Sequence, residues 1–97
     1  MQATLNIYAD CTSEQPTKTY VCRRLLYGVS KKIQALSENM QGKTEAEQEA
    51  INIDILKTIF PHFETEDFNY IDANEWLKFV NEIARETTEI VEVAAKK

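Results

Sequence analysis

Glycine, cysteine and histidine are scarce in this sequence, and their scarcity argues against several classes of functional site. The 97 residues include two glycines, two cysteines and one histidine. Two isolated glycines, Gly28 and Gly42, cannot form the glycine-rich loops that hold phosphates or dinucleotides. No Cys-x-x-Cys occurs, and His62 has no partner at a metal-ligand spacing. We therefore expect no catalytic residue, no metal and no cofactor, in a protein that is not an enzyme.

The two cysteines, Cys11 and Cys22, are too few for the disulfide scaffold of a small secreted domain. They could face each other across a hairpin, but two free thiols are the favoured interpretation. Residues 1–7 lack the basic start and the apolar run of a signal peptide, and no apolar run is long enough to span a bilayer. The sequence predicts a cytosolic protein without a membrane partner.

Residues 64–75 are rich in carboxylates and invite a calcium-binding interpretation. Their oxygens miss the alternating EF-hand positions, and Asn69 and Tyr70 stand where the loop needs glycine. Helix caps explain the same residues better. Thr65 is expected to cap a short helical turn, and Asp72, three residues before Glu75, is expected to cap the last helix.

Charge is unevenly spread along the chain. Residues 1–43 carry six Lys/Arg against three Asp/Glu, whereas residues 44–97 carry five against thirteen, and the net charge is −5. Solvated helix faces are the favoured explanation; the alternative is an acidic surface that docks on a basic partner. Arg23, Arg24, Lys31 and Lys32 are likewise expected to be solvated helix residues rather than a binding patch. Net acidity argues against nucleic acid as a partner.

The N-terminal region has the pattern of a β-hairpin, which we place at residues 1–23. Residues 3–8 alternate, with Ala3, Leu5 and Ile7 on one side, and residues 17–22 are β-branched and aromatic. A turn-rich segment ending in Pro16 separates the two strands. Because two strands alone are marginal in water, the hairpin is expected to lie on helices or to join another sheet.

Helical periodicity follows, in a core that we place at residues 24–86. One apolar face recurs from Leu25 to Met40, with Gly42 expected as the C-cap. The next helix begins at a capping box of Thr44 and Glu47 and ends before Pro61. The sequence therefore predicts one domain, residues 1–97, of the α+β class and mainly α: an N-terminal β-hairpin followed by three or four helices.

The last helix carries an apolar stripe of some twenty residues, roughly 30 Å long at 1.5 Å per residue. One small domain can cover only part of that length, so residues 87–97 are expected to be a frayed or partner-bound extension. The dense aromatic residues of positions 60–79 are expected in the core, with a partner groove as the alternative. Candidate residues for partner binding or self-association are Trp76, Phe79, Ile83, Ile90, Val91 and Ala94, and a homo-oligomer is expected.

The order of these patterns resembles the tail assembly chaperones of long-tailed bacteriophages and prophages of Gram-positive bacteria. The resemblance covers about residues 3–85. It consists of a short hairpin, a basic helix start at residues 21–26, a helix containing residues 31–36, and a final helix at residues 76–83. Its most specific part is residues 55–68, in which a helix ends at Phe60 and is followed by Phe63, an acidic cap and Phe68. Pro61-His62 stands where family members often have glycine, and residues 69–72 depart from a frequent Tyr-Asp-Gly-Leu-like step.

The resemblance implies a protein without enzymatic chemistry. Such chaperones bind the long, aggregation-prone tape measure protein and help to recruit tail tube protein around it. They act in the host cell cytoplasm and are absent from the mature virion. The alternative from a different class is an acidic inhibitor or adaptor that occupies a basic surface on another protein, as the charge of residues 44–97 would allow.

Overall fold

The computed structural model describes the backbone of residues 3–95 and the side chains of residues 3–90. An antiparallel hairpin of β1 (Ala3–Ile7) and β2 (Lys18–Cys22) precedes the helices. These are α1 (Tyr27–Glu38), α2 (Glu45–Ile59), the short 3-10 helix η1 (Thr65–Tyr70) and the long α3 (Ala73–Ala95). The expected α+β, mainly α class with an N-terminal hairpin is confirmed.

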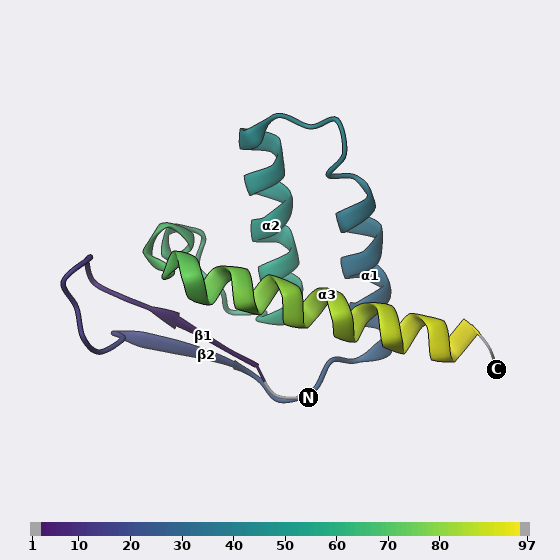
Figure 1. Ribbon diagram of the computed structural model, residues 1–97, viewed down its shortest axis with the longest axis horizontal. Coiled ribbons are helices and arrows are strands. Elements are labelled where there is room, and N and C mark those ends of the chain that lie inside the picture. Colours follow the sequence, from purple (N-terminus) through teal and green to yellow (C-terminus); the bar gives the residue numbers. More distant parts are fainter. Residues whose placement is uncertain (1–2, 96–97) are drawn as a thin grey trace.

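The helix α3 organises the molecule. The helices α1 and α2 form an antiparallel pair on one side of α3, and β1 of the hairpin contacts α3 near its start (Figure 1). The far end of α3 runs out beyond α1, as Figure 1 shows at its yellow end. The hairpin therefore does lie on a helix, which supplies the apolar cover that two isolated strands need.

Backbone and side-chain hydrogen bonds fasten the hairpin to the segment before α3. The Tyr8 amide donates to the Tyr70 carbonyl at 2.9 Å, and Ile7 forms an isolated antiparallel bridge with Ile71. These contacts cover part of the outer edge of β1. The inward-facing Leu5 and Ile7 are buried, so the same strand contributes apolar side chains to the interior.

A second fastening is a polar cluster around Asp67, which we call the Asp67 cluster: Lys18, Tyr20, Glu64 and Asp67. Lys18 Nζ donates to Asp67 Oδ2 at 2.8 Å and to Glu64 Oε1 at 3.3 Å. Tyr20 Oη donates to Asp67 Oδ2 at 2.7 Å and accepts from the Glu64 amide at 3.3 Å. Strand β2 is thus joined to η1 through a buried carboxylate.

The predicted limits of α2 are confirmed. The Thr44 hydroxyl accepts from the Glu47 amide at 3.2 Å, and the Glu47 carboxylate accepts from the Thr44 amide, also at 3.2 Å. Both halves of the capping box are therefore present. At the other end Phe60 is extended, with φ −119° and ψ 94°, as expected for the residue before Pro61.

The predicted limits of α1 were wrong at both ends. The helix begins at Tyr27, because Leu26 is extended at φ −70° and ψ 148°. It ends at Glu38 with Asn39, a weak helix former, as the C-cap, so Gly42 is not the C-cap. Tight turns follow the helix, and Gly42 has the positive φ of 78° that favours glycine.

Of the two caps expected around η1 and α3, one is present. Asp72 Oδ1 accepts from the Asn74 amide at 2.8 Å and from the Glu75 amide at 3.1 Å, which is an N-cap geometry. Thr65 does not cap η1, because Glu64 occupies the cap position and makes no side-chain cap bond. The Glu75 carboxylate instead accepts from Asn6 Nδ2 at 2.9 Å, a further link to β1.

The core lies where the hairpin, the α1–α2 pair and α3 meet. Its aromatic part runs from Tyr20 through Phe60 to Phe79, with ring centroids 5.4 and 5.9 Å apart. Phe63 is also buried against Tyr20, and the expected core role of the aromatic residues at positions 60–79 is confirmed for Phe60, Phe63 and Phe79. The buried core cluster comprises Leu5, Cys22, Ile33, Ile55, Leu56, Phe60, Phe63, Phe79 and Ile83.

Candidate functional site: an apolar groove between three helices

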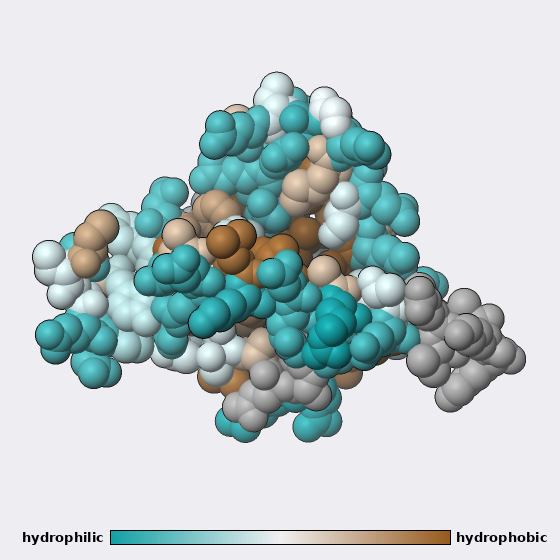
Figure 2. Space-filling model, in the orientation of Figure 1, coloured by the Kyte–Doolittle hydropathy of each residue, from teal (hydrophilic) through white to brown (hydrophobic). Residues whose placement is uncertain are grey.

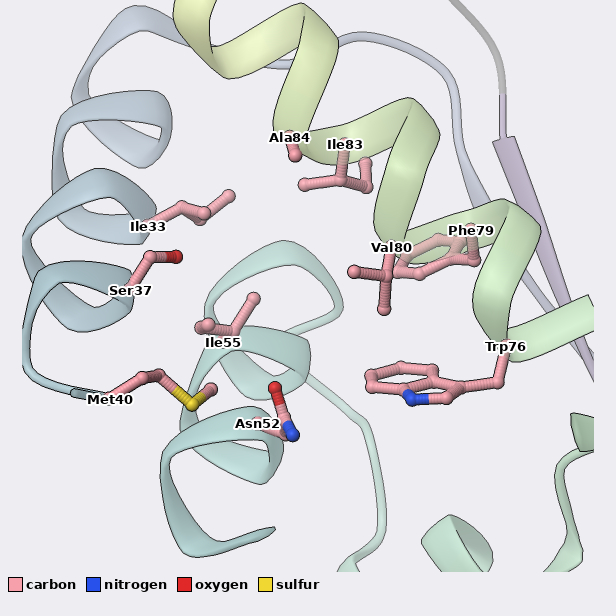
Figure 3. Close-up of a pocket in the computed structure, with 10 residues that line it drawn as sticks. All are labelled: Ile33, Ser37, Met40, Asn52, Ile55, Trp76, Phe79, Val80, Ile83 and Ala84. Carbon is pink, nitrogen blue, oxygen red and sulfur yellow. The ribbon is translucent and has the colours of Figure 1, made fainter. Parts of the chain in front are cut away.

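A groove opens where α3 crosses the α1–α2 pair. The close-up in Figure 3 shows side chains from all three helices surrounding one common space. The wall from α1 comes from residues one turn apart, and α3 contributes residues on the face that it turns towards the pair. The lining residues are Ile33, Ser37, Met40, Asn52, Ile55, Trp76, Phe79, Val80, Ile83 and Ala84.

The lining of the groove is almost entirely apolar. Side-chain polar atoms come only from Ser37, Asn52 and the indole nitrogen of Trp76 among its ten residues, and none of the ten is titratable. The groove has a volume of about 120 Å³. Cavities near that size accommodate a benzene-sized apolar group. The groove therefore suits one large apolar side chain, with a few polar groups at hand to orient the segment that carries it.

The groove is open because its α3 wall is partly exposed. Val80 is 38% exposed, and its neighbour Leu77, which is outside the lining, is 61% exposed. Figure 2 shows apolar residues gathered at the centre of one face, where α3 passes across the α1–α2 pair, with hydrophilic residues around them. An apolar centre with a polar rim is the usual anatomy of a protein-binding surface.

Trp76 stands at one end of the groove and Met40 at the other in Figure 3. Trp76 is held by aromatic contacts: it stacks on Phe79 with centroids 6.1 Å apart, and Phe68 meets it edge-on at 5.4 Å. Met40 lies in the turn after α1, where its flexible thioether can adapt to different side chains. One end of the groove is thus rigid and the other adaptable.

The structure separates the six residues that the sequence singled out for binding. Trp76 lines the groove and is half-buried, whereas Phe79 and Ile83 are 5% and 4% exposed and belong to the protein's own core. Ile90 is half-buried near the end of the described side chains. Val91 and Ala94 lie outside the residues whose side chains are described. Buried Thr87 shows that packing against α3 continues to that residue.

The part of the groove that comes from the other two helices could not be recognised in the sequence. Ile33 and Met40 were recognised as members of an apolar face, but nothing in their spacing showed that the face would be incompletely covered. Asn52 was not singled out. The available signal was a single polar residue among the isoleucines at positions 51, 53 and 55. In the structure Asn52 is half-buried, because that part of α2 lines the open groove.

Comparison with protein-family models, with curated proteins and with solved structures finds no match for this chain. None of the described helices has the length and apolar character needed to cross a membrane. Among the side chains of residues 3–90, no group of three His, Cys, Asp or Glu is placed to hold a metal ion. Both cysteines are free thiols, Cys11 exposed and Cys22 buried, and burial raises the pKa of Cys22.

Proposed function

We propose that this chain is a non-enzymatic binding protein that holds an amphipathic helix of a client protein against its groove. The observation that carries the proposal is the open apolar groove between α1, α2 and α3. An apolar anchor of the client would enter the groove beside Trp76, and the exposed Val80 and Leu77 would contact the next turn of the client helix. Helix-in-groove recognition uses such anchors at positions three or four residues apart.

The client that we propose is the tape measure protein of a long-tailed bacteriophage, so that the chain acts as a tail assembly chaperone. The support is the resemblance in element order, a short hairpin followed by helices, together with the groove. A long coiled-coil protein presents apolar residues every three or four positions along its length, and each turn of that stripe offers a side chain of the kind the groove suits. In this role the chaperone also helps to recruit tail tube protein, in the host cytoplasm and outside the mature virion.

Co-expression with a tape measure protein of a long-tailed bacteriophage tests the proposal. The unmodified chain is expected to raise the soluble fraction of the tape measure protein and to co-elute with it in gel filtration. Val80→Glu places a carboxylate in the groove, and we expect it to lower the recovered complex at least tenfold. Asn81→Glu is the matched control, because Asn81 is exposed on the same helix and outside the lining.

The two variants differ by one position and carry the same added charge. Equal complex formation by both would contradict the groove as the docking site. An unchanged solubility of the tape measure protein in the presence of the unmodified chain would contradict the chaperone role itself. Circular dichroism of each variant establishes that Val80→Glu still folds, which its exposed position favours.

The alternative, an acidic adaptor for a basic surface, rests on a different observation. Along α2 the carboxylates of Glu45, Glu49 and Asp54 are exposed, and the salt bridges among the described residues do not use them. Binding through such charges weakens steeply as salt rises, because exposed charges are screened within about 8–10 Å at physiological ionic strength. Client binding that survives 0.5 M salt supports the groove, and binding that disappears supports the adaptor.

A further inference from the structure

The segment between β2 and α1 exposes apolar and cationic side chains together. We call this surface the linker patch: Arg23, Arg24, Leu26, Tyr27 and Lys31. Leu26 is 61% exposed and Tyr27 is 48% exposed, and both arginines and Lys31 are exposed as well. The two neighbouring side chains give this segment a small apolar surface that a partner could bury.

The cations of the linker patch are uncompensated within the described part of the chain. The salt bridges among the described residues use Lys18 and Arg85 as their cations, and no described carboxylate lies within 4 Å of the charged nitrogens of Arg23, Arg24 or Lys31. Lys31 Nζ instead lies 5.4 Å from the ring centroid of Tyr27, a cation–π contact that holds its charge beside the aromatic ring. The linker patch thus gathers three exposed cations within residues 23–31 of a chain whose net charge is −5.

These residues contribute little to the stability of α1. The helix has no acidic residue in its first turn and no side-chain cap at Leu26. Cations near a helix N-terminus oppose the helix dipole, so the arginines do not serve the helix. Leu26 and Tyr27 do not serve the core either, because about half or more of each side chain faces solvent. Contact with a partner would bury these apolar side chains and pair these cations.

We propose that the linker patch binds an acidic, amphipathic segment of a partner protein. Arginine guanidinium groups pair with carboxylates through two parallel hydrogen bonds, and Tyr and Arg are the residues enriched at protein interfaces. Leu26 and Tyr27 would bury apolar side chains of the same segment. Arg23 and Lys31 are separated by the four linker positions 23–26 and one helical turn, a span of at most about 20 Å even if the linker is fully extended. A helix of about 13 residues covers that span.

The charge of the whole chain favours a protein over a nucleic acid or a membrane. Sixteen acidic residues would repel a continuous phosphate backbone or an anionic bilayer everywhere outside the patch. A short acidic segment avoids that repulsion, because it need only cover the patch. Exposed leucine and tyrosine side chains also match the apolar residues of such a segment.

This surface is separate from the groove. The lining of the groove takes residues of α1 from Ile33 onwards and includes none of the linker patch. The proposal therefore does not depend on the client of the groove, and a protein that holds a client at one surface has a second surface for another partner.

Fluorescence anisotropy with labelled 14-residue helical peptides tests this inference. The first peptide carries leucine at every third or fourth position and glutamate elsewhere; the second replaces leucine by serine, and the third replaces glutamate by lysine. We expect the first peptide to bind at 50 mM salt, with at least tenfold weaker binding at 500 mM. We expect at least fivefold weaker binding of the second peptide and no binding of the third.

Charge-reversal variants then test whether the first peptide binds at the linker patch. Arg23→Glu combined with Arg24→Glu should weaken the binding of the first peptide at least tenfold. Lys57→Glu with Lys78→Glu changes the net charge equally at two exposed lysines elsewhere and should change affinity less than threefold. The proposal would be overturned if both double variants lost equal affinity for the first peptide, or if Val80→Glu in the groove lowered that affinity. Tighter binding of a 20-nucleotide single-stranded RNA or of phosphatidylserine vesicles than of the first peptide would also overturn it.

Discussion

Asp67 is the residue on which the attachment of the hairpin depends most. Its carboxylate is buried, yet it accepts from both Lys18 and Tyr20 of β2. Burial alone would raise the pKa of Asp67, but the hydrogen bonds from Lys18 and Tyr20 outweigh that effect and leave the pKa below its ordinary value. Burial and the Asp67 carboxylate raise the pKa of Tyr20. The proton between the two groups therefore stays on the phenol, and the carboxylate is charged.

A lowered pKa makes stability depend on pH in a defined direction. The unfolded carboxyl titrates near pH 4, and the folded one titrates lower, so the Asp67 cluster contributes fully above about pH 4. That contribution is lost as pH falls through the lowered pKa. Asp67→Asn should reduce the free energy of unfolding by about 1–3 kcal/mol at pH 7, and by less at pH 3. Urea unfolding followed by Trp76 fluorescence measures both values.

The control for this prediction is Glu66→Gln, which neutralises the adjacent, exposed carboxylate. Exposed single charges change stability by less than about 0.5 kcal/mol, so this variant should unfold near the unmodified protein at both pH values. If Asp67→Asn lowers the free energy of unfolding as much at pH 3 as at pH 7, the electrostatic explanation is contradicted and a packing defect is indicated.

At the scale of elements, a helix end could be predicted from the sequence where residues next to that end determine it. The capping box at Thr44 and the proline after Phe60 specify both ends of α2 with residues that are adjacent in sequence, and both ends were predicted. The ends of α1 were not, because no cap residue precedes it and the apolar period continues through turns that are not helical. An apolar face predicts which residues turn inwards but not where the hydrogen-bond ladder stops.

Two buried hydroxyls, those of Ser30 on α1 and Thr87 on α3, have no hydrogen-bond partner among the described residues. A buried unpaired hydroxyl costs roughly 1–3 kcal/mol in proteins. Thr87→Val keeps the shape and removes the hydroxyl, so we expect it to raise the free energy of unfolding by about 1 kcal/mol. Thermal unfolding monitored by circular dichroism checks the increase.

Thr88→Val is the matched control, because Thr88 is exposed on the neighbouring position of α3. It makes the same chemical change without removing a buried polar atom, and should move stability by less than 0.5 kcal/mol, roughly the limit for surface substitutions. If Thr87→Val destabilises the protein while Thr88→Val does not, the Thr87 hydroxyl has a partner in solution and the packing argument fails.

At the scale of the whole molecule, the groove is the feature that sequence patterns could not supply. The α1 and α3 walls were recognisable as apolar faces, and Trp76 was singled out as a binding residue. The opening depends on how α3 crosses the α1–α2 pair, and a one-dimensional pattern carries no crossing angle. Phe79 and Ile83 illustrate the consequence: their stripe continues from Trp76, yet the crossing buries them in the core.

Self-association through the far end of α3 remains a prediction of the sequence, and Ile90 is the described residue that bears on it. The helix has 23 residues, about 35 Å, and its far end runs past α1 in Figure 1. Ile90 lies three residues beyond buried Thr87 and is only half-buried. Completing the burial of one such side chain contributes about 1 kcal/mol, which supports weak association at high concentration.

Ile90→Ser should therefore lower the average mass measured by light scattering at high protein concentration, while the helical signal at 222 nm stays nearly the same. Thr88→Ser is the control, because it introduces the same side chain at an exposed site on the same turn. A decrease with both substitutions would reflect fraying of the helix rather than a lost contact. An unmodified protein that stays monomeric at millimolar concentration contradicts self-association, and the groove and the linker patch would then act from a single copy of the chain.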